Sequence, residues 1–157
     1  MKTSTNGVAF VDREEGEVLH LYTDAAGKPT IGVGHLVKAG ENFTNGITHD
    51  EALALLAGDL SIAEGNVNRL CPAAGAGTLS QNAFDALVSF AFNCGGGALQ
   101  VSSVRRLLNA GDMAGAAAAF ELWDKRQDPK TGALVVDAGL LARRKREAAL
   151  FLTPDAA

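Results

Sequence analysis

A long helical periodicity that begins at Thr48 constrains the fold of this chain more than any other feature. The sequence from Thr48 to Glu51 has the spacing of a capping box, a threonine followed three residues later by a glutamate. Apolar side chains then recur at intervals of three and four, at Leu53, Leu56, Leu60, Ala63, Val67 and Leu70. The pattern predicts one helix over residues 49–70, about 22 residues and roughly 33 Å long, which can link two lobes.

The segment before that helix predicts a small β lobe. Residues 5–15 are typical of a short helix, which Gly16 is placed to stop. Residues 20–23 and 30–35 are rich in β-branched and aromatic side chains, and a Gly- and Pro-containing turn separates them. We therefore expect a hairpin, followed over residues 36–47 by a loop or a third short strand.

The segment after that helix predicts a helical lobe. Its first helix starts after Ser80 and buries a stripe at i, i+3, i+4 and i+7 from Phe84. Shorter helices follow, capped by Ser102 or Ser103 and by Asp112, then a polar loop over 124–138 and a last helix over 139–152. We expect an α+β fold. Its parts are a β lobe at about 17–47, the linking helix at 49–70, and a helical lobe at 71–157 that also includes 5–15.

Composition excludes several classes of protein. The chain has 157 residues and a net charge of −4, with its acidic excess in residues 1–94 and a small basic excess beyond. That balance argues against nucleic-acid binding, which needs a basic surface. No apolar run reaches the ~20 residues of a membrane span, and the N-terminus lacks a signal-peptide pattern, so we expect a cytoplasmic protein without stable membrane insertion. Cys71 and Cys94 are either two thiols, which the cytoplasm favours, or one bridge.

Two carboxylates near the hairpin suggest acid–base chemistry. Glu15 ends the first predicted helix, Asp24 begins the hairpin turn, and Thr30 begins the return strand. Cleavage of a glycosidic bond needs a carboxylic acid and an ionised carboxylate on opposite sides of the bond. The acid gains a raised pKa from apolar burial, whereas the partner suits an exposed turn. On spacing alone, solvated carboxylates remain the stronger alternative.

The three histidines, His20, His35 and His49, have no metal-ligand spacing, so we expect no metal and no cofactor.

The residues around this constellation resemble the phage-type lysozymes, glycoside hydrolase family 24. In that family a Glu before a Gly is followed nine residues later by an Asp and six residues after that by a Thr, as at Glu15, Asp24 and Thr30. The resemblance runs from about residue 8 to 152 and includes the stretches Gly27–His35, Phe84–Asn93, Leu107–Asp112, Trp123–Lys125, Gly139-Leu140 and Arg143-Arg144.

The resemblance implies a role for each matching residue. Glu15 looks like the general acid, Asp24 like the carboxylate that orients water or stabilises positive charge, and Thr30 like the hydroxyl that positions water. Residues that match the lining of the sugar cleft between the lobes are Leu36, Phe92 and Ser103. Asn93 is a further candidate for substrate binding: at a helix end before a glycine run, it can either cap the helix or hydrogen-bond an N-acetyl group. Two further residues are supporting.

Those supporting residues are Arg143 and His35. Arg143 matches an arginine that pairs with the catalytic Glu, and His35 is expected to form structural hydrogen bonds behind the hairpin. Four basic side chains in succession, at residues 143–146, are typical of a solvated helix face. We therefore expect Arg144, about 100° further around the helix, to contribute much less than Arg143.

The resemblance implies an endolysin that hydrolyses the β-1,4 bond between N-acetylmuramic acid and N-acetylglucosamine in peptidoglycan. It implies a monomer that waits in the host cytoplasm until another protein makes a lesion in the membrane. Alternatives are a lytic transglycosylase, a chitin hydrolase, or a wall-binding module that has lost catalysis. Two departures concern the far end of the cleft: Ala117 stands where a family member has an asparagine, and the loop at 127–137 is long.

Overall fold

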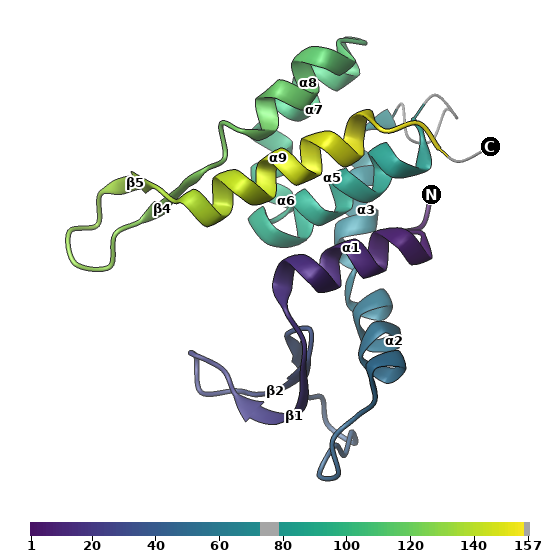
Figure 1. Ribbon diagram of the computed structural model, residues 1–157, viewed down its shortest axis with the longest axis vertical. Helices are drawn as coiled ribbons and strands as arrows, with labels where there is room; N and C mark the ends of the chain where they lie inside the picture. Colours follow the sequence, from purple (N-terminus) through teal and green to yellow (C-terminus); the bar gives the residue numbers. More distant parts are fainter. Residues whose placement is uncertain (73–78, 156–157) are drawn as a thin grey trace. The chain divides into compact units, whose positions relative to one another are not determined.

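The computed structural model describes residues 1–72 and 79–155, which form two compact units (Figure 1). One unit is Thr3–Ile62. The other consists of Met1–Lys2 and the chain from Ala63 onward. The helix at residues 5–15 belongs to the first unit, with the strands, whereas the sequence had grouped it with the later helices. The Ala- and Gly-rich run at 73–78 lies outside the described residues.

The unit Thr3–Ile62 begins with helix α1 (Thr5–Glu15), as predicted. The Ser4 side chain accepts a hydrogen bond from the Gly7 N–H at its start, and Gly16 ends it with a φ of 82°. A three-stranded antiparallel sheet follows in the order β1 (Val18–Thr23), β2 (Pro29–Gly32), β3 (His35–Leu36). Helix α2 (His49–Asp59) completes the unit and packs against both α1 and β2.

The predicted second strand, 30–35, is wrong in its extent, because the chain reverses within it. Gly32 and Gly34 have φ values of 64° and 74°, a conformation that glycine adopts without steric penalty. The chain therefore turns at Val33, and β3 pairs back onto β2 with Leu36 opposite Thr30. The reversal places a residue expected in the cleft beside a residue expected in catalysis.

The predicted single helix over 49–70 is also wrong. The capping box is present at Thr48 and Glu51, but the helix ends at Asp59, and helix α3 (Ser61–Leu70) starts after Leu60. Gly58, Asp59 and Ser61 flank this break, and all three have low helix propensity. The apolar spacing continues through the break since Leu60 itself is fully buried. Periodicity alone therefore could not reveal it.

The other unit is built around α5 (Gln81–Cys94), which packs against α9 (Ala138–Leu152) (Figure 1). Between them in the chain lie α6 (Gly96–Val101), α7 (Ser103–Asn109) and α8 (Met113–Phe120), and α8 packs against both α7 and α9. The predicted caps are confirmed at Ser80, Ser102 and Asp112. The α5 stripe is buried as expected, and Phe90, Phe120 and Phe151 extend it into an aromatic core.

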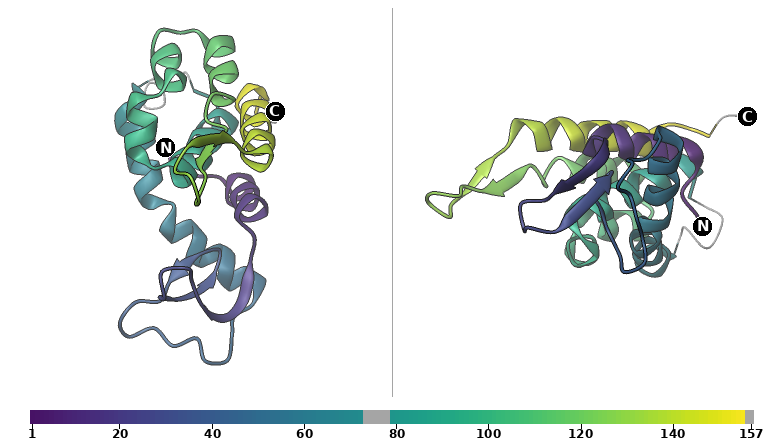
Figure 2. Two further views of the ribbon diagram at one scale, coloured as in Figure 1. Left: turned by 90° about the vertical axis from the view of Figure 1, so that its left-hand side faces the viewer. Right: turned by 90° about the horizontal axis from the view of Figure 1, so that it is seen from below.

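Three elements of this unit, α6, β4 and β5, were not predicted. The glycine run after Cys94 ends α5, yet Gly96 and Gly97 begin the short helix α6. The expected polar loop at 124–138 contains a hairpin of β4 (Lys125–Gln127) and β5 (Leu134–Val136), visible at the N-terminal end of α9 in Figure 2. The β-branched pair at 135–136 and the turn residues Asp128, Pro129 and Gly132 were the available sequence signal.

Cys71 and Cys94 are both free thiols, the first buried and the second half-buried. Burial raises the pKa of Cys71 to about 11, against the opposing charge of Arg105. Because the thiolate is the reactive form, we expect Cys71 to resist thiol reagents in the native protein. Titration of unfolded protein that has not been reduced should count both thiols, and a count near zero would contradict the structure.

Candidate active site

The three residues predicted to carry the chemistry all belong to the unit Thr3–Ile62. Glu15 is the last residue of α1, Asp24 directly follows β1, and Thr30 is the second residue of β2. Glu15 is exposed, which differs from the apolar burial that the sequence reasoning expected for the acid, whereas Asp24 is half-buried. The end of α1, the turn after β1 and the strand β2 thus each supply one of the three candidate catalytic side chains.

The Asp24 carboxylate is held in one orientation by the hairpin turn. Its Oδ1 accepts hydrogen bonds from the backbone N–H groups of Ala26 and Lys28, each at 2.8 Å. The Asp24 N–H donates to the Lys28 carbonyl at 2.9 Å, which closes the turn from the other side. An aspartate that bonds its own turn in this way loses little further freedom when a substrate binds.

The Thr30 hydroxyl is oriented by the same turn. Thr30 is 2% exposed, and its Oγ1 donates to the Lys28 carbonyl at 3.0 Å. Since the hydroxyl hydrogen is used in that bond, Oγ1 can only accept a hydrogen bond from a water molecule. A water that donates to Thr30 keeps a lone pair for attack. Leu36, 44% exposed, lies opposite Thr30 and offers an apolar surface next to it.

The buried His35 ring contacts two carboxylates, those of Asp59 and Glu41. The ring is 2% exposed, and it lies 2.7 Å from Asp59 Oδ2 through Nδ1 and 3.0 Å from Glu41 Oε2 through Nε2. Burial lowers the pKa of the His35 ring, but the hydrogen bonds and charges of Glu41 and Asp59 outweigh it and raise the pKa above its ordinary value. The protonated ring thus joins β3, the following loop and α2.

The raised pKa gives the contribution of His35 to stability a definite pH dependence. The folded protein holds the proton more tightly than the unfolded chain does, so this contribution is fully present below the ordinary pKa of about 6.5 and is lost as pH rises through the folded-state pKa. We expect His35→Gln to lower the free energy of unfolding more at about pH 6 than at about pH 9. Urea unfolding at both pH values tests this, and an equal loss at both would contradict it.

The remaining predicted cleft residues lie in the helical unit. Phe92 and Asn93 are at the end of α5, half-buried and exposed respectively, and Ser103 is half-buried at the start of α7. Asn93 lines a hollow of about 330 Å³ together with Cys94, Trp123, Lys125 and Leu140. Trp123 also packs edge-on against Phe90, with ring centroids 5.5 Å apart, so it serves both the core and this hollow.

The basic run at 143–146 is only partly solvated, which corrects the sequence prediction. Arg143 is 5% exposed and Arg144 is fully buried, whereas Lys145 and Arg146 are exposed. Both buried guanidinium groups face Glu147, at 3.0 Å from Arg143 and 3.3 Å from Arg144. Because Arg144 is buried and paired in the same way as Arg143, we expect its loss to destabilise the protein as much as the loss of Arg143 does.

Glu147 was missed by the sequence analysis. It is 0% exposed, and its Oε1 also accepts a hydrogen bond from the Ser89 hydroxyl at 2.7 Å. Burial raises the pKa of Glu147 even though Arg144, Ser89 and Arg143 act in the opposite direction. The spacing from Arg143 to Glu147, i to i+4 on one helix, was the signal that could have identified the pair.

One cluster has the donor types of a metal site. Asp12, Glu17 and His49 bring one ligand atom each to within 4.8 Å of one another. They come from α1, the segment after it and the start of α2, so no sequence spacing could reveal them. His49 Nδ1 lies 2.8 Å from Glu17 Oε2, and this contact raises the pKa of His49. The ion pair between His49 and Glu17 accounts for the closeness of these side chains.

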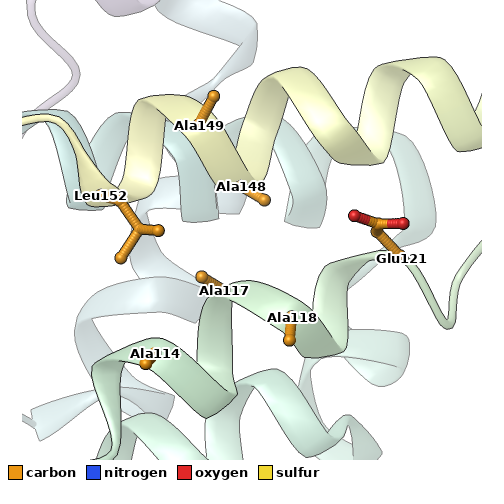
Figure 3. Close-up of a pocket in the computed structure, with 7 residues that line it drawn as sticks. All are labelled: Ala114, Ala117, Ala118, Glu121, Ala148, Ala149 and Leu152. Carbon is orange, nitrogen blue, oxygen red and sulfur yellow. The ribbon is translucent and has the colours of Figure 1, made fainter.

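A second hollow, about 310 Å³, lies between α8 and α9 (Figure 3). Alanines of both helices line it, with Leu152 and Glu121 toward its ends. Ala117, at the position where the sequence analysis noted the loss of an asparagine, borders this hollow and is 3% exposed. Because alanine offers no hydrogen bond, this position supplies no polar contact to a sugar.

Several known proteins are similar to this chain in sequence and in fold. A family model described as phage lysozyme matches residues 12–147. The endolysin of Salmonella phage P22 is 42% identical over 157 residues, which cover 98% of this chain and 99% of that protein. A solved structure of a P22 lysozyme mutant has a TM-score of 0.82 and 41% identity, covering 98% of this chain and 99% of that one. The muramidase domain of SpmX from Asticaccaulis excentricus has the same TM-score and the same coverage at 38% identity.

The α+β, lysozyme-like fold class is thereby confirmed. None of the helices among the described residues is long and apolar enough to cross a membrane.

Proposed function

Because this chain belongs to the phage lysozyme family and is a peptidoglycan-hydrolysing glycoside hydrolase, we propose that Glu15, Asp24 and Thr30 carry out its reaction. The observation that carries this assignment is the backbone of Lys28. Its N–H donates to the Asp24 carboxylate, and its carbonyl accepts the Thr30 hydroxyl hydrogen. The backbone of Lys28 therefore sets the orientation of both the Asp24 carboxylate and the Thr30 hydroxyl, the two groups that would bind the attacking water.

The proposed reaction cleaves the β-1,4 bond between N-acetylmuramic acid and N-acetylglucosamine. Glu15 gives its proton to the glycosidic oxygen as the C–O bond breaks, and Asp24 stabilises the positive charge that develops on the sugar ring. A water that donates to Thr30 Oγ1 adds to the anomeric carbon and loses a proton to the Asp24 carboxylate, and Glu15 regains a proton from solvent before the next cycle. These steps need only proton transfer and charge stabilisation from the residues named.

Substrate binding is proposed for Leu36, Phe92, Asn93 and Ser103, with Arg143 and His35 as supporting residues. Leu36 is exposed beside Thr30, and Asn93 borders a hollow. We further propose that the protein acts as a monomer, accumulates in the host cytoplasm, and reaches the wall through a lesion that a separate protein makes. The phage endolysins among its relatives support this course of events.

Mass spectrometry of purified peptidoglycan digested by the protein tests the proposed reaction. A hydrolase leaves reducing ends that carry the elements of water, whereas a lytic transglycosylase leaves anhydro-muramic ends. We expect reducing N-acetylmuramic acid ends, and we expect none of them above background from the Glu15→Gln protein. Anhydro ends as the main product would replace the hydrolytic assignment with the transglycosylase.

A further inference from the structure

Arg144 directs its guanidinium group to the end of α5, where the candidate glycan-binding residue Asn93 lies. Its Nη2 donates to Asn93 Oδ1 at 2.6 Å, and its Nη1 donates to Cys94 Sγ at 3.0 Å. The guanidinium carbon also stands 5.1 Å from the centroid of the Phe90 ring. Contacts to three residues of one helix leave this buried cation a single position.

The chemistry of guanidinium determines which way the Asn93 amide points. A guanidinium group only donates hydrogen bonds, so Asn93 must present its oxygen to Arg144 and turn its NH₂ group away. Asn93 is exposed on its other side and lines the 330 Å³ hollow. Two neighbours in that lining, Trp123 and Lys125, also carry polar groups that only donate. These side chains together favour a ligand group that accepts hydrogen bonds.

The Glu147 carboxylate pairs with the Arg144 guanidinium group that bonds Asn93 and Cys94. Its Oε2 lies 3.3 Å from Arg144 Nη1, and both side chains are fully buried. The other carboxylate oxygen is bound by Arg143 Nε and the Ser89 hydroxyl. Ser89 and Arg143 thus fix the position of the Glu147 carboxylate, and its second oxygen stays beside Arg144.

We propose that Arg144, held by Glu147, is a positioning residue that fixes the Asn93 amide so that its NH₂ group binds the carbonyl oxygen of an N-acetyl group on the glycan. The identity of the ligand rests on the proposed function, since peptidoglycan sugars carry such groups. The orientation of the amide does not, because it follows from the donor-only chemistry of Arg144.

The Asn93→Asp variant separates this role from a structural one. A carboxylate keeps the acceptor that Arg144 needs, so we expect a melting temperature equal to or above that of the parent. It has no hydrogen to donate, so we expect the affinity for the N-acetylglucosamine trimer to fall about tenfold. The deacetylated glucosamine trimer should bind better than before, because its ammonium groups suit a carboxylate.

Binding is measured by the fluorescence of Trp123, the one tryptophan of the chain, which lines the same hollow. The Glu15→Gln protein serves as the parent, so that no sugar is cleaved during titration. Arg144→Lys should weaken binding of the acetylated trimer, since a single ammonium cannot hold Asn93, Cys94 and Glu147 together. The matched control is Lys145→Ala, an exposed neighbour on α9, which should bind both trimers as the parent does.

Two outcomes would overturn the proposal. One is an Asn93→Asp protein that keeps the parent's affinity and its preference for acetylated sugar. The other is a parent that shows no saturable binding of the acetylated trimer. Failure of the proposed function would look different: the Glu15→Gln protein would retain lytic activity on peptidoglycan, whatever the titrations show.

Discussion

Replacing Glu15 with glutamine is expected to lower lytic activity by about 10²–10⁴-fold, the contribution typical of general acid catalysis. The substitution keeps the shape of the side chain and removes its transferable proton. Glu15 is exposed at the end of α1, so we expect the variant to fold with an unchanged melting temperature. Loss of turbidity of purified peptidoglycan measures the activity, and circular dichroism checks the fold.

The matched control is Glu14→Gln, the preceding carboxylate on the same helix. It removes the same charge within one residue of the proposed acid, so it separates a loss of proton transfer from a general change in local charge. We expect it to keep most of the wild-type rate. If Glu15→Gln instead retained more than about a tenth of the activity while Glu14→Gln lost it, the acid would be Glu14.

Replacing Arg144 with alanine is expected to lower the free energy of unfolding by about 3–5 kcal/mol, because it leaves a buried carboxylate without one of its cations. Glu147 Oε2 is fully buried beside Arg144, and the Asn93 oxygen would lose its donor as well. This loss reverses the expectation from sequence, in which Arg144 belonged to a solvated face. Urea unfolding of wild type and variant at one pH measures it.

Lys145→Ala provides the comparison for that measurement, since it removes an adjacent but exposed charge from the same helix. Surface substitutions of this kind change stability by about 0.5 kcal/mol or less. We expect Arg143→Ala to resemble Arg144→Ala, because Arg143 bonds the same carboxylate and also Ser89. Equal small losses in all three variants would mean that the buried network contributes nothing to stability.

The starts of four helices, α2, α5, α7 and α8, could be predicted from sequence because each carries a local capping signal. Ser80, Ser102 and Asp112 each bond the backbone within a few residues of themselves, and the Thr48–Glu51 capping box does the same. Such bonds depend on the residues present and not on the rest of the fold. The position of Asp24 in a hairpin turn was predictable for the same reason.

Sequence reasoning failed where the deciding contact is distant in the chain. Periodicity continued through the break at Leu60 because burial, and not helical geometry, sets which positions are apolar. The reversal at Gly32 and Gly34 depends on pairing between β2 and β3, which a run of β-branched residues cannot distinguish from a single strand.

The sequence by itself determined the fold class and, through the Glu15, Asp24 and Thr30 spacing together with the stretches Gly27–His35 and Phe84–Asn93, the family to which the chain is similar. Only the tertiary structure decided which basic side chains of the run at 143–146 are buried. Arg143 and Arg144 are adjacent in that run, and although the i to i+4 spacing marks Arg143 as a partner of Glu147, no local signal indicates that either arginine is buried. Their burial depends on Ser89 and Asn93 in α5, more than fifty residues earlier in the chain. A charge becomes part of the interior only when distant partners replace its water, and packing alone brings those partners together.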